Sequence, residues 1–159
     1  MKKQLKSIFL GLIIWPVFTA SVYTGEKTAI DFSLQQLHGD PVSVSDYRGQ
    51  WVVLNYWATW CAPCRKEIPD LSALHDSRDD IVVLGLAYEE AEPEEFDTFL
   101  DEFNPSYPML LVDVYAPPEP FGAPKVLPTT IVLDPNGYEV KTFVGPVTGE
   151  DIAAVVDES

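Results

Sequence analysis

The two cysteines of this chain lie in one short motif, Cys61-Ala62-Pro63-Cys64. An apolar stretch, residues 51–58, leads into the motif, and residues 65–75 follow it with apolar side chains at helical spacing. A strand that delivers a Cys-x-x-Cys to the start of a helix is the arrangement of a redox-active dithiol. A structural staple explains the pair less well, because so short a loop constrains the unfolded chain little.

The chain is strongly acidic, with a formal net charge of −15 over 159 residues. This length suits one domain with a core of its own. Nucleic acids and anionic lipid surfaces attract basic proteins, so the charge argues against both as partners. We therefore expect no nucleic-acid function.

Residues 1–24 form a separate unit, in which lysines precede an almost uncharged apolar run at 8–22. This is the pattern of a secretory signal peptide. The cleavage site is poorly defined, and the run is short against the roughly 20 residues of a spanning helix, so cleavage and membrane anchoring both stay open. In either case we expect residues 25–159 to form a single extracytoplasmic (periplasmic) domain, soluble after cleavage or anchored by the N-terminal segment.

Hydrophobic patterning predicts strands and helices in alternation. This order implies an α/β fold whose central sheet has helices on both faces. The turn Asp134-Pro135-Asn136-Gly137 predicts a terminal hairpin, so the sheet is expected to be mixed. The expected strands are 30–37, 52–56, 81–87, 109–112, 129–133 and 138–144; the expected helices are 65–75, 93–103 and 150–156; and the proline-rich residues 113–125 are expected to be irregular.

These segments resemble thioredoxin at several points. Residues 53–64 are similar to the thioredoxin active-site strand and motif, and Pro69 matches the proline that kinks the next helix. Leu-Pro-Thr-Thr at 127–130 matches the cis-proline loop. The export signal and the additional helix at 93–103 narrow the resemblance, over residues 29–157, to the extracytoplasmic TlpA/ResA group of thioredoxin-like oxidoreductases. The resemblance implies a thioredoxin-like fold with an N-terminal extension and an inserted helix.

Cys61 is expected to attack substrate and Cys64 to resolve the mixed disulfide. Cys61 precedes the helix, where free N–H groups and the helix dipole favour a thiolate, and we expect its sulfur to be exposed. Cys64 lies one turn further and is expected to be shielded. Trp60, Ala62 and Pro63 are expected substrate contacts. Pro63 also lacks an N–H that would stabilise the thiolate, which favours a reductant over a strong oxidant.

Leu127 and Pro128 form the other expected substrate contact. The resemblance implies a cis Pro128, which places the Leu127 backbone beside the disulfide and lets it pair with an extended substrate. Pro124 is the alternative cis proline. Pro128 is preferred because it directly precedes the expected strand at 129–133, as the family pattern requires.

Two interpretations of the proton carrier stay open. Thioredoxin has a buried aspartate where this chain has Asn55, and the resembling group often places a glutamate just after the next strand. Glu89 fits that position, so we expect it to carry the proton of Cys64. The alternative is a solvated Glu89, since four of the six residues after it are acidic.

The resemblance implies an exported enzyme that reduces protein disulfides and is itself reduced by an upstream membrane reductant. Cytochrome c maturation is the typical process in the resembling group. We expect a monomer with no cofactor beyond the redox-active Cys61–Cys64 disulfide, and no metal. The alternative from another class is a copper-binding chaperone, which needs a third ligand that the sequence does not obviously supply. The sequence motif of peroxidases is absent.

Overall fold

A computed structural model describes residues 27–159 of the chain. The expected signal peptide or anchor at residues 1–24 lies outside this part. Within the described part, no helix is both long and apolar enough to cross a membrane. The expected division into an N-terminal segment and a single domain at 25–159 therefore stays a prediction.

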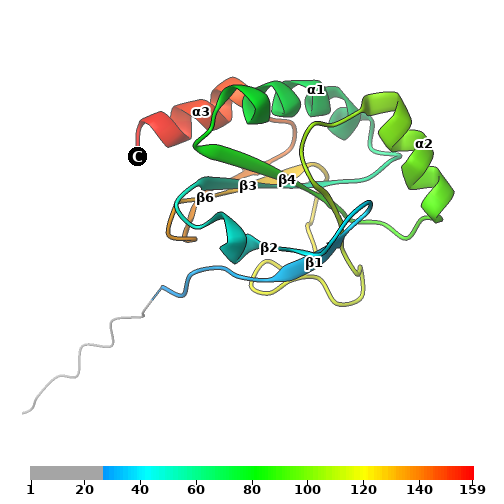
Figure 1. The fold of residues 1–159 in the computed structure, drawn as a ribbon, viewed down its shortest axis with the longest axis horizontal. Helices are drawn as coiled ribbons and strands as arrows, with labels where there is room; N and C mark the ends of the chain where they lie inside the picture. Colours follow the sequence, from blue (N-terminus) through cyan, green and yellow to red (C-terminus); the bar gives the residue numbers. More distant parts are fainter. Residues whose placement is uncertain (1–26) are drawn as a thin grey trace, which may run out of the picture.

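One mixed sheet of seven strands forms the centre of the described residues, in the order β2-β1-β5-β4-β3-β6-β7 (Figure 1). The neighbours β3, β4 and β5 run parallel, whereas β6 is antiparallel to β3, β7 to β6 and β1 to β5. The mixed sheet predicted from the sequence is confirmed. Its strands are β1 (Ser33–Gln36), β2 (Val42–Ser43), β3 (Trp51–Trp57), β4 (Ile81–Ala87), β5 (Met109–Leu111), β6 (Thr129–Leu133) and β7 (Glu139–Val144).

The central strand β3 is buried along nearly its whole length. It pairs with β4 from Trp51 to Trp57 and with β6 on its other edge. Val53 belongs to one core cluster and Leu54 to the other, because successive side chains of a strand point to opposite faces. Both faces are covered, which explains why the sequence of β3 is a nearly continuous apolar run.

All three α-helices of the described chain pack on one face of the sheet, which we call the helical face (Figure 1). Its core joins Ile68 of α1, Phe96 of α2 and Ile152 of α3 with Trp57 of β3. The helices are α1 (Ala62–Ser77), α2 (Pro93–Phe103) and α3 (Gly149–Asp157).

The opposite face of the sheet is covered by other kinds of structure. The segment before β1, the single 3-10 turn η1 (Val44–Tyr47) and the loop containing Phe121 pack there. The sequence predicted helices on both faces, but on this face the only helical element of the described chain is the 3-10 turn η1. The physical reason is that residues 113–125 contain four prolines, which lack the N–H that a helix interior needs.

Gly85 of β4 allows side chains to pack tightly beneath α1. A Cβ at this position would lie 2.2 Å from Met109 Sδ, 3.1 Å from Trp57 Nε1 and 3.2 Å from Tyr107 Cε2. These three side chains therefore occupy the space that a larger residue would need.

We predict that Gly85→Ala lowers the free energy of unfolding by about 1–3 kcal/mol, the usual cost of overpacking a core. Urea unfolding of the wild type and the variant measures the difference. In a Met109→Ala background the same change should cost less, because the nearest obstructing atom has been removed. An equal cost in both backgrounds would contradict this packing.

Candidate active site

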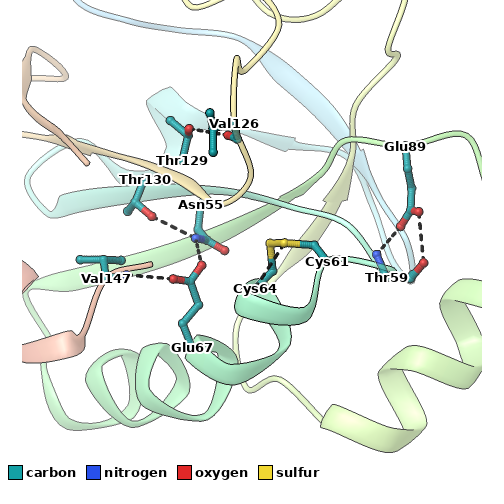
Figure 2. Close-up of a disulfide and its surroundings, with 10 residues drawn as sticks. All are labelled: Asn55, Thr59, Cys61, Cys64, Glu67, Glu89, Val126, Thr129, Thr130 and Val147. Carbon is teal, nitrogen blue, oxygen red and sulfur yellow. Dashed lines mark hydrogen bonds between the residues drawn. A yellow bond between two sulfur atoms is a disulfide. The ribbon is translucent and has the colours of Figure 1, made fainter. Parts of the chain in front are cut away.

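Cys61 and Cys64 form a disulfide at the N-terminus of α1 (Figure 2). Strand β3 ends at Trp57, and α1 begins at Ala62 with Cys61 as its N-cap residue. The Cys64 N–H donates to Cys61 Sγ at 3.3 Å. The sulfur of Cys61 therefore takes the place of the oxygen with which Ser or Asp usually caps a helix, and the positive end of the helix dipole acts on it.

The two cysteines differ less in exposure than the sequence suggested. Cys64 is fully buried, as expected, but Cys61 is only 3% exposed. The expectation of an exposed Cys61 is thus wrong for this disulfide-bonded form, because the residue packs into the core of the helical face with Ala58, and Leu127 packs against that core.

Glu89 holds the loop that precedes the motif. It lies just beyond the end of β4, and its carboxylate accepts the Thr59 N–H at 2.6 Å and the Thr59 hydroxyl at 3.1 Å. Figure 2 shows this contact on the Cys61 side of the disulfide. The structure thus gives Glu89 a partner in the backbone next to Trp60, and each of its hydrogen bonds goes to Thr59.

Glu67 is the buried carboxyl group of this site, and the sequence analysis did not single it out. It lies on α1, three residues after Cys64, and is 5% exposed. Its Oε1 accepts from Asn55 Nδ2 at 2.8 Å, and its Oε2 accepts the Val147 N–H at 3.1 Å (Figure 2). Burial raises the pKa of Glu67, and the hydrogen bonds from Asn55 and Val147 partly oppose the increase.

The sequence does contain a signal for Glu67. Cys64, Ile68 and Leu71 form the buried stripe of α1, and Glu67 falls on this stripe at helical spacing. A carboxyl group is seldom buried without a partner. A glutamate on an apolar stripe, one turn after a redox cysteine, was therefore the pattern to examine.

Asn55 links this carboxyl group to the sheet. Its side chain is fully buried in β3, and its Nδ2 also donates to the Thr130 hydroxyl of β6 at 3.0 Å. One amide thus joins β3, β6 and α1. The position where thioredoxin has an acid is here occupied by the residue that orients Glu67.

The residues expected to contact substrate differ in how far they are exposed to solvent. Trp60 is 69% exposed, Ala62 is exposed and Pro63 is half-buried. Leu127 is half-buried, whereas Pro128 is buried.

The Leu127–Pro128 peptide bond is cis in the structure, and the bond before Pro124 is not among the cis bonds. A second cis bond, Glu119–Pro120, had no signal in the sequence analysis. The Pro128 carbonyl accepts the Gly145 N–H at 2.9 Å, which ties this loop to the end of β7.

No group of three or more His, Cys, Asp or Glu side chains within residues 27–159 is arranged to hold a metal ion. The chemistry that the described residues support at this site is thiol–disulfide exchange, with a buried carboxyl group one helical turn after the second cysteine.

Comparisons with known proteins agree with this geometry. The model of the AhpC/TSA family matches residues 26–140. The chain is 33% identical to the thiol-disulfide oxidoreductase ResA of Geobacillus thermodenitrificans, over 96% of this chain and 95% of that protein.

Two solved structures are also similar to this chain. A DsbF homologue from Corynebacterium diphtheriae has a TM-score of 0.71 at 33% identity and covers 82% of this chain and 85% of its own. A secreted thiol-disulfide isomerase from Corynebacterium glutamicum has a TM-score of 0.68 at 31% identity, with 80% and 81% covered.

The wild type should become less stable as the pH rises and Glu67 loses its proton. We predict that Glu67→Gln does not show this decrease. The folded chain binds the Glu67 proton more tightly than the unfolded chain, so the contribution of this group is fully present below its ordinary pKa of about 4.5. That contribution is lost as the pH rises through the raised pKa of the folded state.

Chemical unfolding of the oxidised protein across this pH range measures the effect. The stability of Glu67→Gln relative to the wild type should increase with pH and then level off. Asp76→Asn, which changes an exposed carboxylate on the same helix, is the control. A difference between Glu67→Gln and the wild type that does not change with pH would refute the prediction.

Proposed function

This chain belongs to the AhpC/TSA family, among its ResA-like thiol-disulfide oxidoreductases, and from this premise we propose that it reduces protein disulfides outside the cytoplasm. The observation that carries the proposal is the Cys61–Cys64 disulfide at the N-cap of α1, at the end of the buried strand β3. These are the only cysteines of the chain, so both electrons that the enzyme transfers come from this pair.

In the proposed cycle the Cys61 thiolate attacks one sulfur of a partner disulfide. The other partner sulfur leaves as a thiolate, and Cys61 is joined to the partner in a mixed disulfide. Cys64 then attacks Cys61 Sγ, which releases the second partner sulfur. The partner has gained two electrons, and the enzyme is left as the disulfide seen in the structure.

Glu67 is the group we propose as the proton acceptor of Cys64. Cys64 is fully buried, so its thiol must lose a proton inside the protein before it attacks. Glu67 follows it by one helical turn, and burial raises the pKa of its carboxyl group toward the range in which a general base works near neutral pH. Glu67 also lines a surface pocket of about 560 Å³ together with Pro63 and Pro146, which gives the proton a route to solvent.

Glu89 has a positioning role in this proposal. Its two hydrogen bonds to Thr59 fix the loop that carries Trp60 and Cys61. The geometry favours Glu67 over Glu89 as the proton carrier, because Glu67 lies on the same buried stripe as Cys64.

Trp60 and the Leu127 backbone are proposed to bind the partner. A large exposed aromatic side chain beside a reactive sulfur suits docking. Within the described residues, the Leu127 N–H and carbonyl make no hydrogen bond. They are therefore available to an extended partner strand.

The location and partners of the enzyme are also proposals. The N-terminal basic and apolar segment supports export, and the similar Corynebacterium glutamicum protein is secreted. The proposed partners are disulfide-containing proteins, cytochrome c precursors among them, and a membrane reductant that restores the dithiol. The enzyme is proposed to act as a monomer, with its own disulfide in place of a cofactor.

A trapping experiment tests the proposed division of labour. Cys64→Ala should accumulate a mixed disulfide through Cys61 when mixed with a disulfide-containing protein, because the resolving thiol is missing. Cys61→Ala should accumulate far less, since Cys64 lies inside the first turn of α1 and lacks the N-cap position that stabilises a thiolate. Non-reducing gels and mass spectrometry identify the adducts. Adducts through Cys64 alone would reverse the roles, and no adduct in either variant would refute the function.

A second experiment separates Glu67 from Glu89. Glu67→Gln should shift the pH dependence of Cys64 alkylation in the reduced protein, because the proton acceptor is lost. Glu89→Gln should slow partner reduction several-fold, yet leave that pH dependence in place. If the pH dependence shifts in Glu89→Gln and not in Glu67→Gln, the proton acceptor is Glu89, the residue expected from the sequence.

A further inference from the structure

Three buried polar atoms on the helical face have no hydrogen-bond partner within residues 27–159: Asn55 Oδ1, Trp57 Nε1 and Tyr107 Oη. The exposed fractions of these residues are 0%, 0% and 4%. A buried polar group without a partner destabilises the folded state. Native proteins therefore rarely leave several such groups together.

The three side chains meet around Gly85 of β4. Asn55 and Trp57 are two residues apart on β3, so their side chains point to the same face. Gly85 is the β4 neighbour of Asn55. The Cβ position at Gly85 lies 3.1 Å from Trp57 Nε1 and 3.2 Å from Tyr107 Cε2, and Met109 Sδ is the atom nearest to it. Cε2 of Tyr107 is bonded to the ring carbon that carries the hydroxyl group.

The hydrogen-bonding requirements of the three groups are complementary. The Trp57 indole can only donate, Asn55 Oδ1 can only accept, and the Tyr107 hydroxyl can do either. One water molecule can accept from the indole, donate to the amide oxygen and bond to the hydroxyl. Buried water molecules typically make about three such bonds to groups that otherwise have none.

We propose that a buried water molecule binds between Asn55, Trp57 and Tyr107, and that through it Tyr107 positions Asn55 against Glu67. This inference rests on the proposed function only for the role of Glu67 as proton acceptor. The amide is held at both ends: Oδ1 by the water, and Nδ2 by Glu67 at 2.8 Å and Thr130 at 3.0 Å.

In this arrangement the Tyr107 hydroxyl group influences the pKa of Glu67 through the water and Asn55. The hydrogen bond from Asn55 lowers the pKa of the Glu67 carboxyl group and opposes the effect of burial. That bond is strongest when the amide cannot rotate. Electrostatic coupling to Glu67 adds to the burial that raises the pKa of Tyr107, so the two groups affect each other.

Tyr107→Phe tests the proposal, because it removes only the hydroxyl group. Tyr56→Phe is the matched control, since Tyr56 is 1% exposed, its hydroxyl also lacks a partner in the described chain, and it lies on the opposite face of the sheet. The readout is the titration of Glu67 in the oxidised protein, followed by the infrared carbonyl band of its protonated carboxyl group. The band is assigned by its loss in Glu67→Gln.

We expect Tyr107→Phe to raise the midpoint of this titration by roughly 0.3–1 pH, which corresponds to the loss of about one ordinary hydrogen bond. Tyr56→Phe should leave the midpoint unchanged. A midpoint unchanged in Tyr107→Phe, or shifted equally in both variants, overturns the proposal. The titration needs no turnover, so this failure is distinct from a failure to reduce partner disulfides.

A direct measurement on the wild type keeps the proposal testable if Tyr107→Phe does not fold. Magnetisation transfer from water to the Trp57 indole proton should reveal a bound water with a long residence time. A high-resolution crystal structure should place its oxygen within hydrogen-bond distance of Trp57 Nε1, Tyr107 Oη and Asn55 Oδ1. An indole proton without a neighbouring water, or a crystal structure with none at this place, overturns the proposal.

Discussion

The position of Cys61 at the N-cap of α1 is the constraint on which the rest of the site depends. Strand β3 is paired along both edges, so its end is a fixed point, and α1 starts five residues later, at Ala62. This geometry puts the sulfur of Cys61 in the field of the helix N-terminus. It also places Cys64 in the first turn of α1 with its side chain buried. The Thr59–Glu89 contact and the Leu127–Pro128 loop frame a reactive group whose place the strand and the helix have already set.

Burial of the second cysteine creates a requirement for a proton acceptor inside the protein. The proposed acceptor, Glu67, lies on the same helix, and the cost of burying its charge is offset by donors from two other elements, Asn55 of β3 and the Val147 backbone before α3. The balance between burial and these bonds sets the acidity of Glu67. Gly85 matters here as well, because its missing side chain leaves room for Trp57 and Tyr107 beside Asn55.

Much of the fold was predictable, because strong periodicity marks buried strands and helices. The ranges of β4, α2 and β6 were predicted as observed. The covering of the second face was not, since irregular segments have no period from which packing can be read.

At the site, the motif identified the two cysteines and the cis proline loop. Glu67 was missed because the search for an acid followed family spacing and not the buried stripe of α1. The low exposure of Cys61 follows from its place in the core of the helical face, against which Leu127 packs. No local pattern reveals packing between segments so distant in sequence.

The reduction potential of the Cys61–Cys64 pair tests most directly the central claim that this dithiol is a reductant. Pro63 stands in the first turn of α1 without an N–H, and the helix N–H that contacts Cys61 Sγ is that of Cys64, at 3.3 Å. A thiolate with few donors gains little stabilisation in the reduced state, which keeps the potential low. Equilibration with glutathione and dihydrolipoamide buffers measures it. We predict a value near the about −270 mV of thioredoxin, whereas a value near the about −120 mV of DsbA would contradict the claim.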